Sequence, residues 1–447
     1  MENKKGGLSP LHLSMMALGT VIGGSFFLGS SIGIKAAGPS IILVYLLVGI
    51  LVYFILYALS EMTVADPAPG SFRTFAERAF GPGVGFVVGW VYWTGLILAM
   101  SSEATAVSVF LRIWFGNIPI PILGSGIIVL ITVLNLLGAE KLSKLESSLS
   151  AIKLLAIAGF IVIAIAIIIG ILPNIPSTGL GEIQREALVP SGISGVLGSA
   201  LIVMFTYAGF EVIGLAASEA ENPHVTIPKA ITYTVVGLVG LYSIAIAVLL
   251  PLINTNKLTG DASPFVLALE SRGISWAARV MNIILVIAIL STMLAAMFGL
   301  GRMLRSLAEE GHAPRILKDT GEIPYKGIIF SGISMLIGLG LGFLLPKQVY
   351  IFLVSSGGFS LLFTYFIILI THNRFRKNHG CPPKGKCRFP GYPYTSWISS
   401  IAVIVIIASM PFIEGQGAGL LAGLFLVIFY SSIYVIVYKK SFKVQRE

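Results

Sequence analysis

The most constraining feature of this 447-residue sequence is a series of twelve apolar stretches, each about as long as a membrane-spanning helix. Only 11% of the residues are charged, which is too few to cover the surface of a soluble protein. The stretches are continuously apolar, so they favour helices over the alternating pattern of a β-barrel. The sequence therefore predicts an all-α membrane protein of twelve spans. We expect the spans at residues 12–36, 39–63, 82–112, 120–138, 147–172, 192–218, 229–253, 276–306, 327–345, 348–372, 394–413 and 416–438.

Positively charged residues are distributed unevenly between alternate loops. Of the 30 Lys and Arg residues, 22 fall on one side, 7 fall on the other, and Lys153 lies inside a span. Cytoplasmic loops are enriched in Lys and Arg, so both termini are expected to be cytoplasmic. The net charge of +10 then follows from the topology, and no nucleic-acid partner is expected. The first apolar stretch has no small-residue cleavage site, so we expect it to remain as a span.

Two expected spans are interrupted by glycines. In the first and sixth spans these are Gly19, Gly23, Gly24, Gly29 and Gly33, and Gly195, Gly198, Gly209 and Gly214. Unwound backbone survives in a membrane only beside protein or water, and such pairs in two inverted halves indicate a transporter's central site. Free N–H groups at a break attract a carboxylate, and free carbonyls attract an ammonium group, so the pair suits an amino acid. Alternatively, the glycines only allow close helix packing.

Three ionisable residues lie well inside the spans, where charge is costly. Lys153 lies about two turns into the fifth span, Glu103 lies in the third, and Glu211 directly follows the break in the sixth. Lys153 could carry a proton, because burial disfavours its charged form, or its stem could reach the headgroups. Glu103 and Glu211 could hold protons or act as fixed acceptors for freed backbone N–H groups. Glu61, at the end of the second span, is expected to be solvated.

Two groups of possible metal ligands lie near the cytoplasmic loops. The first comprises Cys381, Cys387, His372 and His379, and the second comprises Glu309, Glu310 and His312. The first lacks the spacing of a common zinc site, and we expect a flexible basic loop with reduced thiols. The second is expected to be an exposed helix end. No P-loop, zincin or GxSxG motif is present, so we predict no enzyme activity, catalytic residue, metal or cofactor.

Four blocks of the sequence occur together in one known family. They are GTVIGGSFFLGSSIGIKAAGPS (19–40), SEMTVADPAPGSFRTFAERAFGPGVGFVVGWVYW (60–93), GFEVIGLAASEAENPHVTIPKAI (209–231) and GRMLRSLAEEGHAPRIL (301–317). In order and spacing the chain resembles the amino acid–polyamine–organocation (APC) superfamily, and within it the bacterial amino acid permease branch. The resemblance implies a LeuT-like fold with two inverted five-helix repeats and alternating access. The repeats would be residues 1–173 and 174–373, followed by a cytoplasmic loop and two helices in 374–447.

The resemblance also implies a substrate site at the two breaks. The backbone around Gly23, Gly24 and Ser25 would receive the substrate carboxylate. Carbonyls near Val21 in the first span, and near Phe205, Thr206 and Ala208 in the sixth, would receive the amino group, with Gly209 at the second break. Phe205 falls at the position of a gating aromatic residue, and the apolar side-chain pocket would be lined by Met100, Phe205 and Ala296. Lys153 matches a lysine that takes the place of a sodium ion in proton-coupled relatives, and Glu103 matches a glutamate common in the branch.

The sequence departs from the branch at two places. Gly24 and Ser25 replace its usual Thr-Gly, and Ala295 and Ala296 replace a polar Asn-Ser pair. No spare acidic residue is evident for a cationic side chain, so neutral L-amino acids are the expected substrates. We therefore expect a cell-membrane permease, monomeric or weakly dimeric, that imports them with protons. The alternatives are an exchanger without proton coupling and a receptor that binds without transporting; the short termini argue against the receptor.

Overall fold

The computed structural model describes residues 9–65, 68, 70–211, 213, 220–260, 262–319, 321, 323–344, 349–380, 389–413 and 415–438. Regular structure in these residues is helical. The α-helices are α1 (Pro10–Val21), α2 (Ser30–Ala37), α3 (Ile41–Ala65), α4 (Phe72–Phe80), α5 (Pro82–Leu111), α6 (Ile120–Asn135), α7 (Ala139–Ile169), α8 (Gly192–Thr206), α10 (Pro223–Leu249), α11 (Pro264–Ser271), α12 (Ser275–Glu309), α13 (Tyr325–Leu344), α14 (Val349–His379), α15 (Tyr394–Ser409) and α16 (Gln416–Ile433). The all-α prediction is confirmed.

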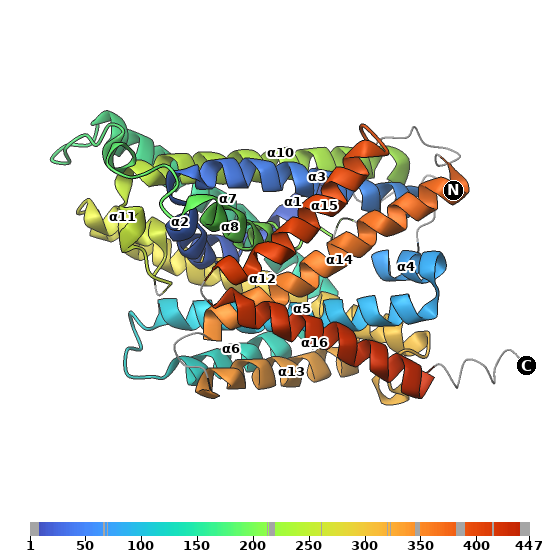
Figure 1. The fold of residues 1–447 in the computed structure, drawn as a ribbon. Helices are drawn as coiled ribbons and strands as arrows, with labels where there is room; N and C mark the ends of the chain where they lie inside the picture. Colours follow the sequence, from blue (N-terminus) through green and yellow to red (C-terminus); the bar gives the residue numbers. More distant parts are fainter. Residues whose placement is uncertain are drawn as a thin grey trace, which may run out of the picture.

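The long helices run between two ends of one bundle (Figure 1). The short helix α4 and the last turns of α16 lie at one end, and α11 lies at the other. We call these the α4 end and the α11 end. The α4 end corresponds to the side that the Lys and Arg distribution predicts to be cytoplasmic.

Eight helical segments of the described residues are long and apolar enough to cross a membrane. Four shorter apolar helices accompany them, namely Pro10–Val21, Ile120–Asn135, Gly192–Thr206 and Tyr325–Gly340. Every expected apolar stretch contains a helix, although one segment, Ser25–Ala65, joins parts of the first two. The count of twelve spans stays a prediction.

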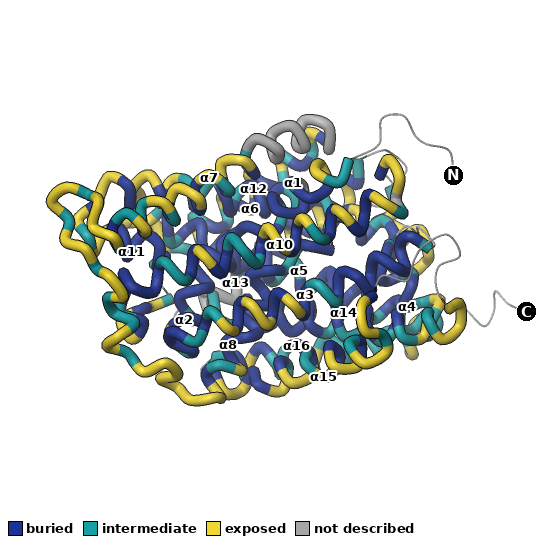
Figure 2. The backbone as a smooth tube through the Cα atoms, turned by 90° about the horizontal axis from the view of Figure 1, so that it is seen from above, coloured by how far each residue is buried: buried dark blue, intermediate teal, exposed yellow. Residues whose placement is uncertain are grey.

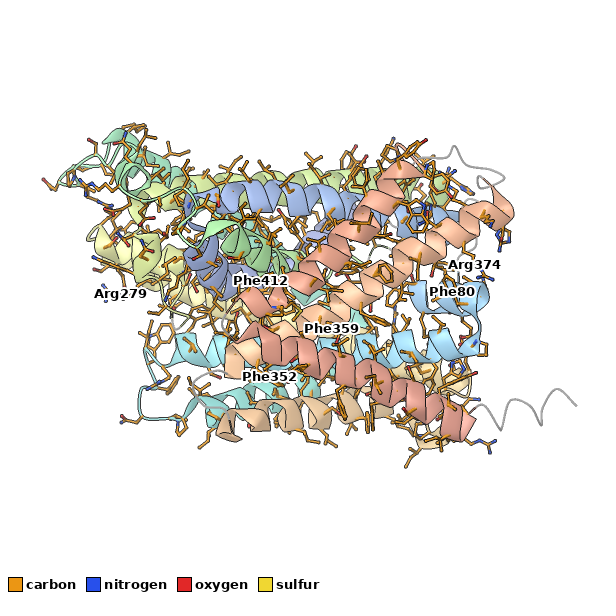
Figure 3. The ribbon with its side chains drawn as sticks, viewed as in Figure 1. Phe80, Arg279, Phe352, Phe359, Arg374 and Phe412 are labelled. Carbon is orange, nitrogen blue, oxygen red and sulfur yellow. The ribbon has the colours of Figure 1, made fainter. Side chains whose placement is uncertain are left out.

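The interior of the bundle is buried, and its outer helices carry the exposed residues (Figure 2). Large apolar side chains on α16, such as Leu421 and Phe425, are more than half exposed. They face outward, as residues in contact with lipid do. In contrast, Phe359 on α14 is buried, and a side chain on Gly423 of α16 would collide with its ring (Figure 3). Close packing of α14 and α16 therefore requires a glycine at this position.

Several boundaries differ from the expected ones. Helix α7 begins at Ala139 rather than near residue 147, and α14 continues to His379 rather than ending near residue 372. The basic residues at the start of the expected loop therefore lie on a helix. Cys381 and Cys387 lie outside the described residues. Helix α4 falls between two expected spans, and its hydrophobic and polar residues separate onto opposite faces.

Candidate functional site

The first break separates α1 from the π-helical turn Ser25–Gly29. Ile22 has extended backbone angles (φ −75°, ψ 100°), so the α-helix ends at Val21. In an unbroken helix, the N–H groups of Gly24 and Ser25 would donate to carbonyls four residues earlier. They donate instead to the Glu103 carboxylate on α5, with Gly24 N at 2.6 Å from Oε2 and Ser25 N at 3.0 Å from Oε1. Each carboxylate oxygen thus accepts one freed N–H.

The second break follows α8, which ends at Thr206. Gly209 has φ +105°, a left-handed conformation that favours glycine. Its N–H donates to Glu211 Oε2 at 3.1 Å. The same carboxylate accepts the hydroxyls of Tyr92 on α5 (2.8 Å) and Tyr365 on α14 (3.3 Å). Glu211 therefore joins the second break to two neighbouring helices.

The two breaks lie against each other. Thr20 Oγ1 lies 3.3 Å from the Gly209 carbonyl oxygen, to which it donates. A Cβ added to Gly209 would lie 3.2 Å from the Thr20 carbonyl oxygen and 3.5 Å from the Cα of Val21. Gly209 is therefore required both for its backbone angle and for this close approach. Packing also explains some of the glycines in these spans, because a side chain on Gly198 would meet Ile413.

Lys153 is fully buried and contacts the last turn of α1. Its Nζ donates to the Gly19 carbonyl oxygen at 2.5 Å and to Thr292 Oγ1 at 2.9 Å. Thr292, on α12, in turn lies 2.9 Å from the Ile22 carbonyl oxygen at the break and donates to it. Lys153 therefore does not reach the membrane surface. Sequence reasoning missed Thr292, for which the only signal was a polar Ser-Thr pair in the eighth apolar stretch.

The expected pocket residues come from three helices. Met100 lies on α5 and Phe205 on α8, and both are buried, whereas Ala296 on α12 is half-buried. No hydrogen bond or ring contact among the described residues joins their side chains. Their role as a shared pocket stays a prediction.

Aromatic rings cover the break on the side of α11. Phe26 stacks on Tyr242 with ring centroids 3.8 Å apart, and it also contacts Phe265 of α11 at 5.1 Å. Tyr45 and Tyr207 extend this cluster, and all five rings are buried. This aromatic layer therefore packs the segment after the first break against α3, α10 and α11. Residues beside the breaks, such as Thr20, Ala208 and Gly209, are half-buried.

Glu61 is buried, so its expected solvation is wrong. Its Oε2 accepts His372 Nε2 and Arg376 Nε, both at 2.8 Å, and its Oε1 accepts Arg376 Nη2 at 3.1 Å and Phe389 N at 2.7 Å. These donors lie on α14 and on the segment that leads into α15. A residue at the end of an apolar helix is solvated only if no other helix covers it. The sequence does not show whether another helix covers Glu61.

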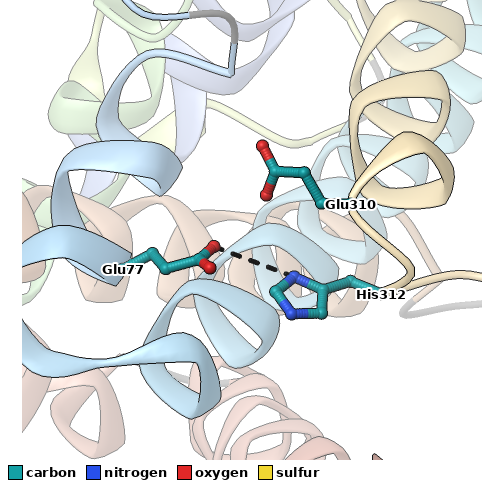
Figure 4. A group of neighbouring side chains, drawn as sticks. All are labelled: Glu77, Glu310 and His312. Carbon is teal, nitrogen blue, oxygen red and sulfur yellow. Dashed lines mark ion pairs between the residues drawn. The ribbon is translucent and has the colours of Figure 1, made fainter. Parts of the chain in front are cut away.

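His312 is also buried, which corrects the prediction of an exposed helix end, although Glu309 and Glu310 are exposed. A further carboxylate comes from Glu77 on α4, which lies beside Glu310 and His312 (Figure 4). Ligand atoms of Glu77, Glu310 and His312 lie within 4.8 Å of one another. However, the Arg73 guanidinium pairs with Glu77 at 3.1 Å and with Glu310 at 2.5 Å. Arg73 thus already supplies the positive charge in this cluster.

The surroundings of this cluster shift the pKa values of His312 and Glu77. Burial, reinforced by the positive charge of Arg73, lowers the pKa of His312 to about 4, so the ring is neutral at pH 7. Burial and the nearby Glu310 carboxylate raise the pKa of Glu77, while Arg73 opposes the rise. The group joins α4 to the end of α12 and lies apart from the two breaks.

Two helices broken side by side, with buried charged residues at each break, define a membrane transporter. The sequence profile of the family described as "Amino acid permease" matches residues 12–447, and the chain belongs to that family. An uncharacterised amino acid permease of Bacillus subtilis, YtnA, is 31% identical over 98% of this chain and 95% of its own length. The gamma-aminobutyric acid permease of B. subtilis is 31% identical over 92% of this chain and 88% of its own. The aromatic amino acid transport protein AroP of Escherichia coli K12 is 31% identical, with 92% and 91% covered.

A solved structure shares the fold. A variant of the manganese transporter of Eremococcus coleocola superposes with a TM-score of 0.58, over 94% of this chain and 93% of its own, at 13% identity. The LeuT-like fold is therefore confirmed. The chain is an amino acid transporter of the cell membrane.

Proposed function

We propose that this permease imports neutral L-amino acids together with protons by alternating access. The observation that carries the proposal is the buried ammonium of Lys153 on the Gly19 carbonyl. A group that can lose its proton lies directly on the helix end that borders the substrate site. Deprotonation would remove the charge from this contact and loosen α1.

The proposed substrate site is the backbone at the two breaks. The residues are Val21, Gly23, Gly24, Ser25, Phe205, Thr206, Ala208 and Gly209, with Met100 and Ala296 beside them. The proton-coupling residues are Lys153, Glu103 and Glu211. In the described conformation, the Glu103 and Glu211 carboxylates accept hydrogen bonds from the protein itself. No further carboxylate of the described residues contacts the breaks, which supports a neutral substrate side chain.

The orientation is proposed from the charge distribution. The α4 end would face the cytoplasm, with both termini on that side. The aromatic layer would then close the site toward the outside, as in a carrier whose site faces inward. The coupling ion would be H⁺, with no cofactor and no metal.

The test is transport by purified protein in liposomes. Wild-type protein with an inward proton gradient is expected to accumulate a labelled neutral amino acid from a panel of L-alanine, L-leucine, L-phenylalanine and γ-aminobutyrate. Lys153→Ala should lose this accumulation but keep counterflow, because exchange needs no net proton movement. The matched control is Lys257→Ala, which changes an exposed lysine of the loop before α11.

Two results would contradict the proposal. Undiminished proton-driven accumulation by Lys153→Ala would remove Lys153 from the mechanism. Uptake by the wild type only into preloaded liposomes, unaffected by a pH gradient, would favour the exchanger. Persistent counterflow in Lys153→Ala shows that the variant is folded.

A further inference from the structure

We propose that Glu103 is an internal competitor of the substrate. Its carboxylate occupies the two N–H groups of the first break that the substrate carboxylate needs, and it must leave them when an amino acid binds. The inference deepens the proposed function and depends on it. Glu103 would thus be a positioning and coupling residue whose hydrogen bonds depend on whether the substrate site is filled.

The hydrogen bonds of the first break carry this inference. Gly24 N and Ser25 N are the N–H groups that the break frees at the start of the following helix, and both already bind a carboxylate at 2.6 and 3.0 Å. The N-terminal end of a helix favours a negative charge. The Glu103 side chain thus forms the contacts that a substrate carboxylate would make. A peptide N–H donates one strong hydrogen bond, so the two carboxylates cannot both use this pair.

Gly24 is what lets Glu103 reach this position. A Cβ at residue 24 would lie 2.6 Å from Glu103 Oε2, 3.0 Å from Ile289 Cδ1 and 3.1 Å from Ala106 Cβ. The Glu103 carboxylate is the nearest of these three and the end of a flexible side chain, so a side chain at position 24 would push it away. Gly24→Ala would therefore displace the Glu103 carboxylate without removing its charge.

The displaced carboxylate would take up a proton. Glu103 is 3% exposed, and a buried carboxylate that loses its donors is unstable as an anion. The titratable groups that act on it are Lys153 on α7, Tyr242 on α10 and Tyr350 on α14. Only Lys153 carries a positive charge, and it already donates to Gly19 and Thr292. Substrate binding would therefore bring in one proton without any contact between the proton and the substrate.

The experiment measures substrate affinity against pH. Purified full-length protein is titrated between pH 5 and pH 8 with whichever of L-alanine, L-leucine and L-phenylalanine gives the strongest counterflow. Uptake of one proton per substrate predicts that the wild-type Kd rises about tenfold per pH unit. Glu103→Gln should bind more tightly at pH 8 and lose the pH dependence. The matched control is Glu309→Gln, an exposed glutamate at the end of α12, which should behave as wild type.

Two further variants separate the possible outcomes. Gly24→Ala should reduce the pH dependence with the carboxylate still present, and Lys153→Ala should keep it. An unchanged pH slope in Glu103→Gln overturns the inference, even if the wild type accumulates substrate on a proton gradient. A merely structural role for Glu103 would weaken binding and leave the slope intact, and that outcome also overturns the inference. A wild-type Kd that does not depend on pH also overturns the inference. The proposed function is tested separately, by accumulation of substrate in liposomes.

Discussion

The buried carboxylate of Glu61 allows a quantitative test of the structure at the α4 end. From the described residues it accepts at least four hydrogen bonds, two of them from one guanidinium in a bidentate arrangement. The Arg376 side chain is 8% exposed and that of Glu61 is 4% exposed. Glu61→Ala would leave this nearly buried positive charge without the carboxylate to which two of its nitrogens donate. Removal of one partner of a buried ion pair costs about 3–5 kcal/mol.

The double variant Glu61→Ala/Arg376→Ala predicts a smaller loss. It removes both charges, so the remaining cost is that of donors that lose their acceptor, about 1–3 kcal/mol. The double variant should therefore be more stable than Glu61→Ala by about 2 kcal/mol, the difference between the two ranges. Thermal unfolding in detergent, followed by tryptophan fluorescence, measures the order of the three melting temperatures. The control is Glu309→Ala, which changes an exposed carboxylate.

The order of melting temperatures shows whether Glu61 and Arg376 form a buried ion pair that stabilises the fold. We expect wild type to melt highest, the double variant next and Glu61→Ala lowest. A Glu61→Ala protein that melts with the wild type would show that this carboxylate is solvated. A double variant that melts below Glu61→Ala would show that the guanidinium stabilises the fold by contacts other than this pair.

The remaining predictions concern the second break and the cluster at α4. Gly209→Ala should abolish uptake while the protein still reaches the membrane. A left-handed backbone costs a residue with a Cβ about 1–2 kcal/mol, and the Cβ would also press on the Thr20 carbonyl. The control is Gly240→Ala, which should transport normally because a Cβ there meets nothing within 4 Å. Because the pKa of His312 is lowered to about 4 in the folded protein, from an ordinary 6.5, the unfolding free energy should fall as pH drops from about 6.5 to about 4. His312→Gln should flatten this part of the stability profile, and an equally steep decline in the variant would assign the effect to another group.

The spans and the two breaks could be predicted from local sequence. A helix in lipid satisfies its own backbone, so the length of an apolar run predicts the helix that it forms. Glycines within such runs then mark the places where that backbone can open. The predicted interruptions at Gly23-Gly24 and Gly209 are both present as ends of helices. Unbroken helices at these positions would have removed the basis for a carrier mechanism.

The partners of the buried charged residues could not be predicted in this way. Glu61 and His372 are 311 residues apart in the chain, and Arg73 and His312 are 239 apart. Nothing in the local pattern around Glu61 distinguishes a solvated helix end from one covered by α14. The same holds for Lys153, whose two-turn depth in the sequence fits both a snorkelling and a buried side chain.

By itself, the sequence determined that the chain crosses a membrane many times, which helices open in the middle and which ionisable residues lie at membrane depth. These features depend on the polarity and backbone freedom of neighbouring residues, which a linear sequence records. Only the tertiary structure decided that Glu103 binds the freed N–H groups of the first break, that Lys153 contacts the last turn of α1, and that Arg73 lies among the carboxylates of the α4 cluster. Those pairings depend on which helix faces bury one another, and that is settled by packing of the whole bundle.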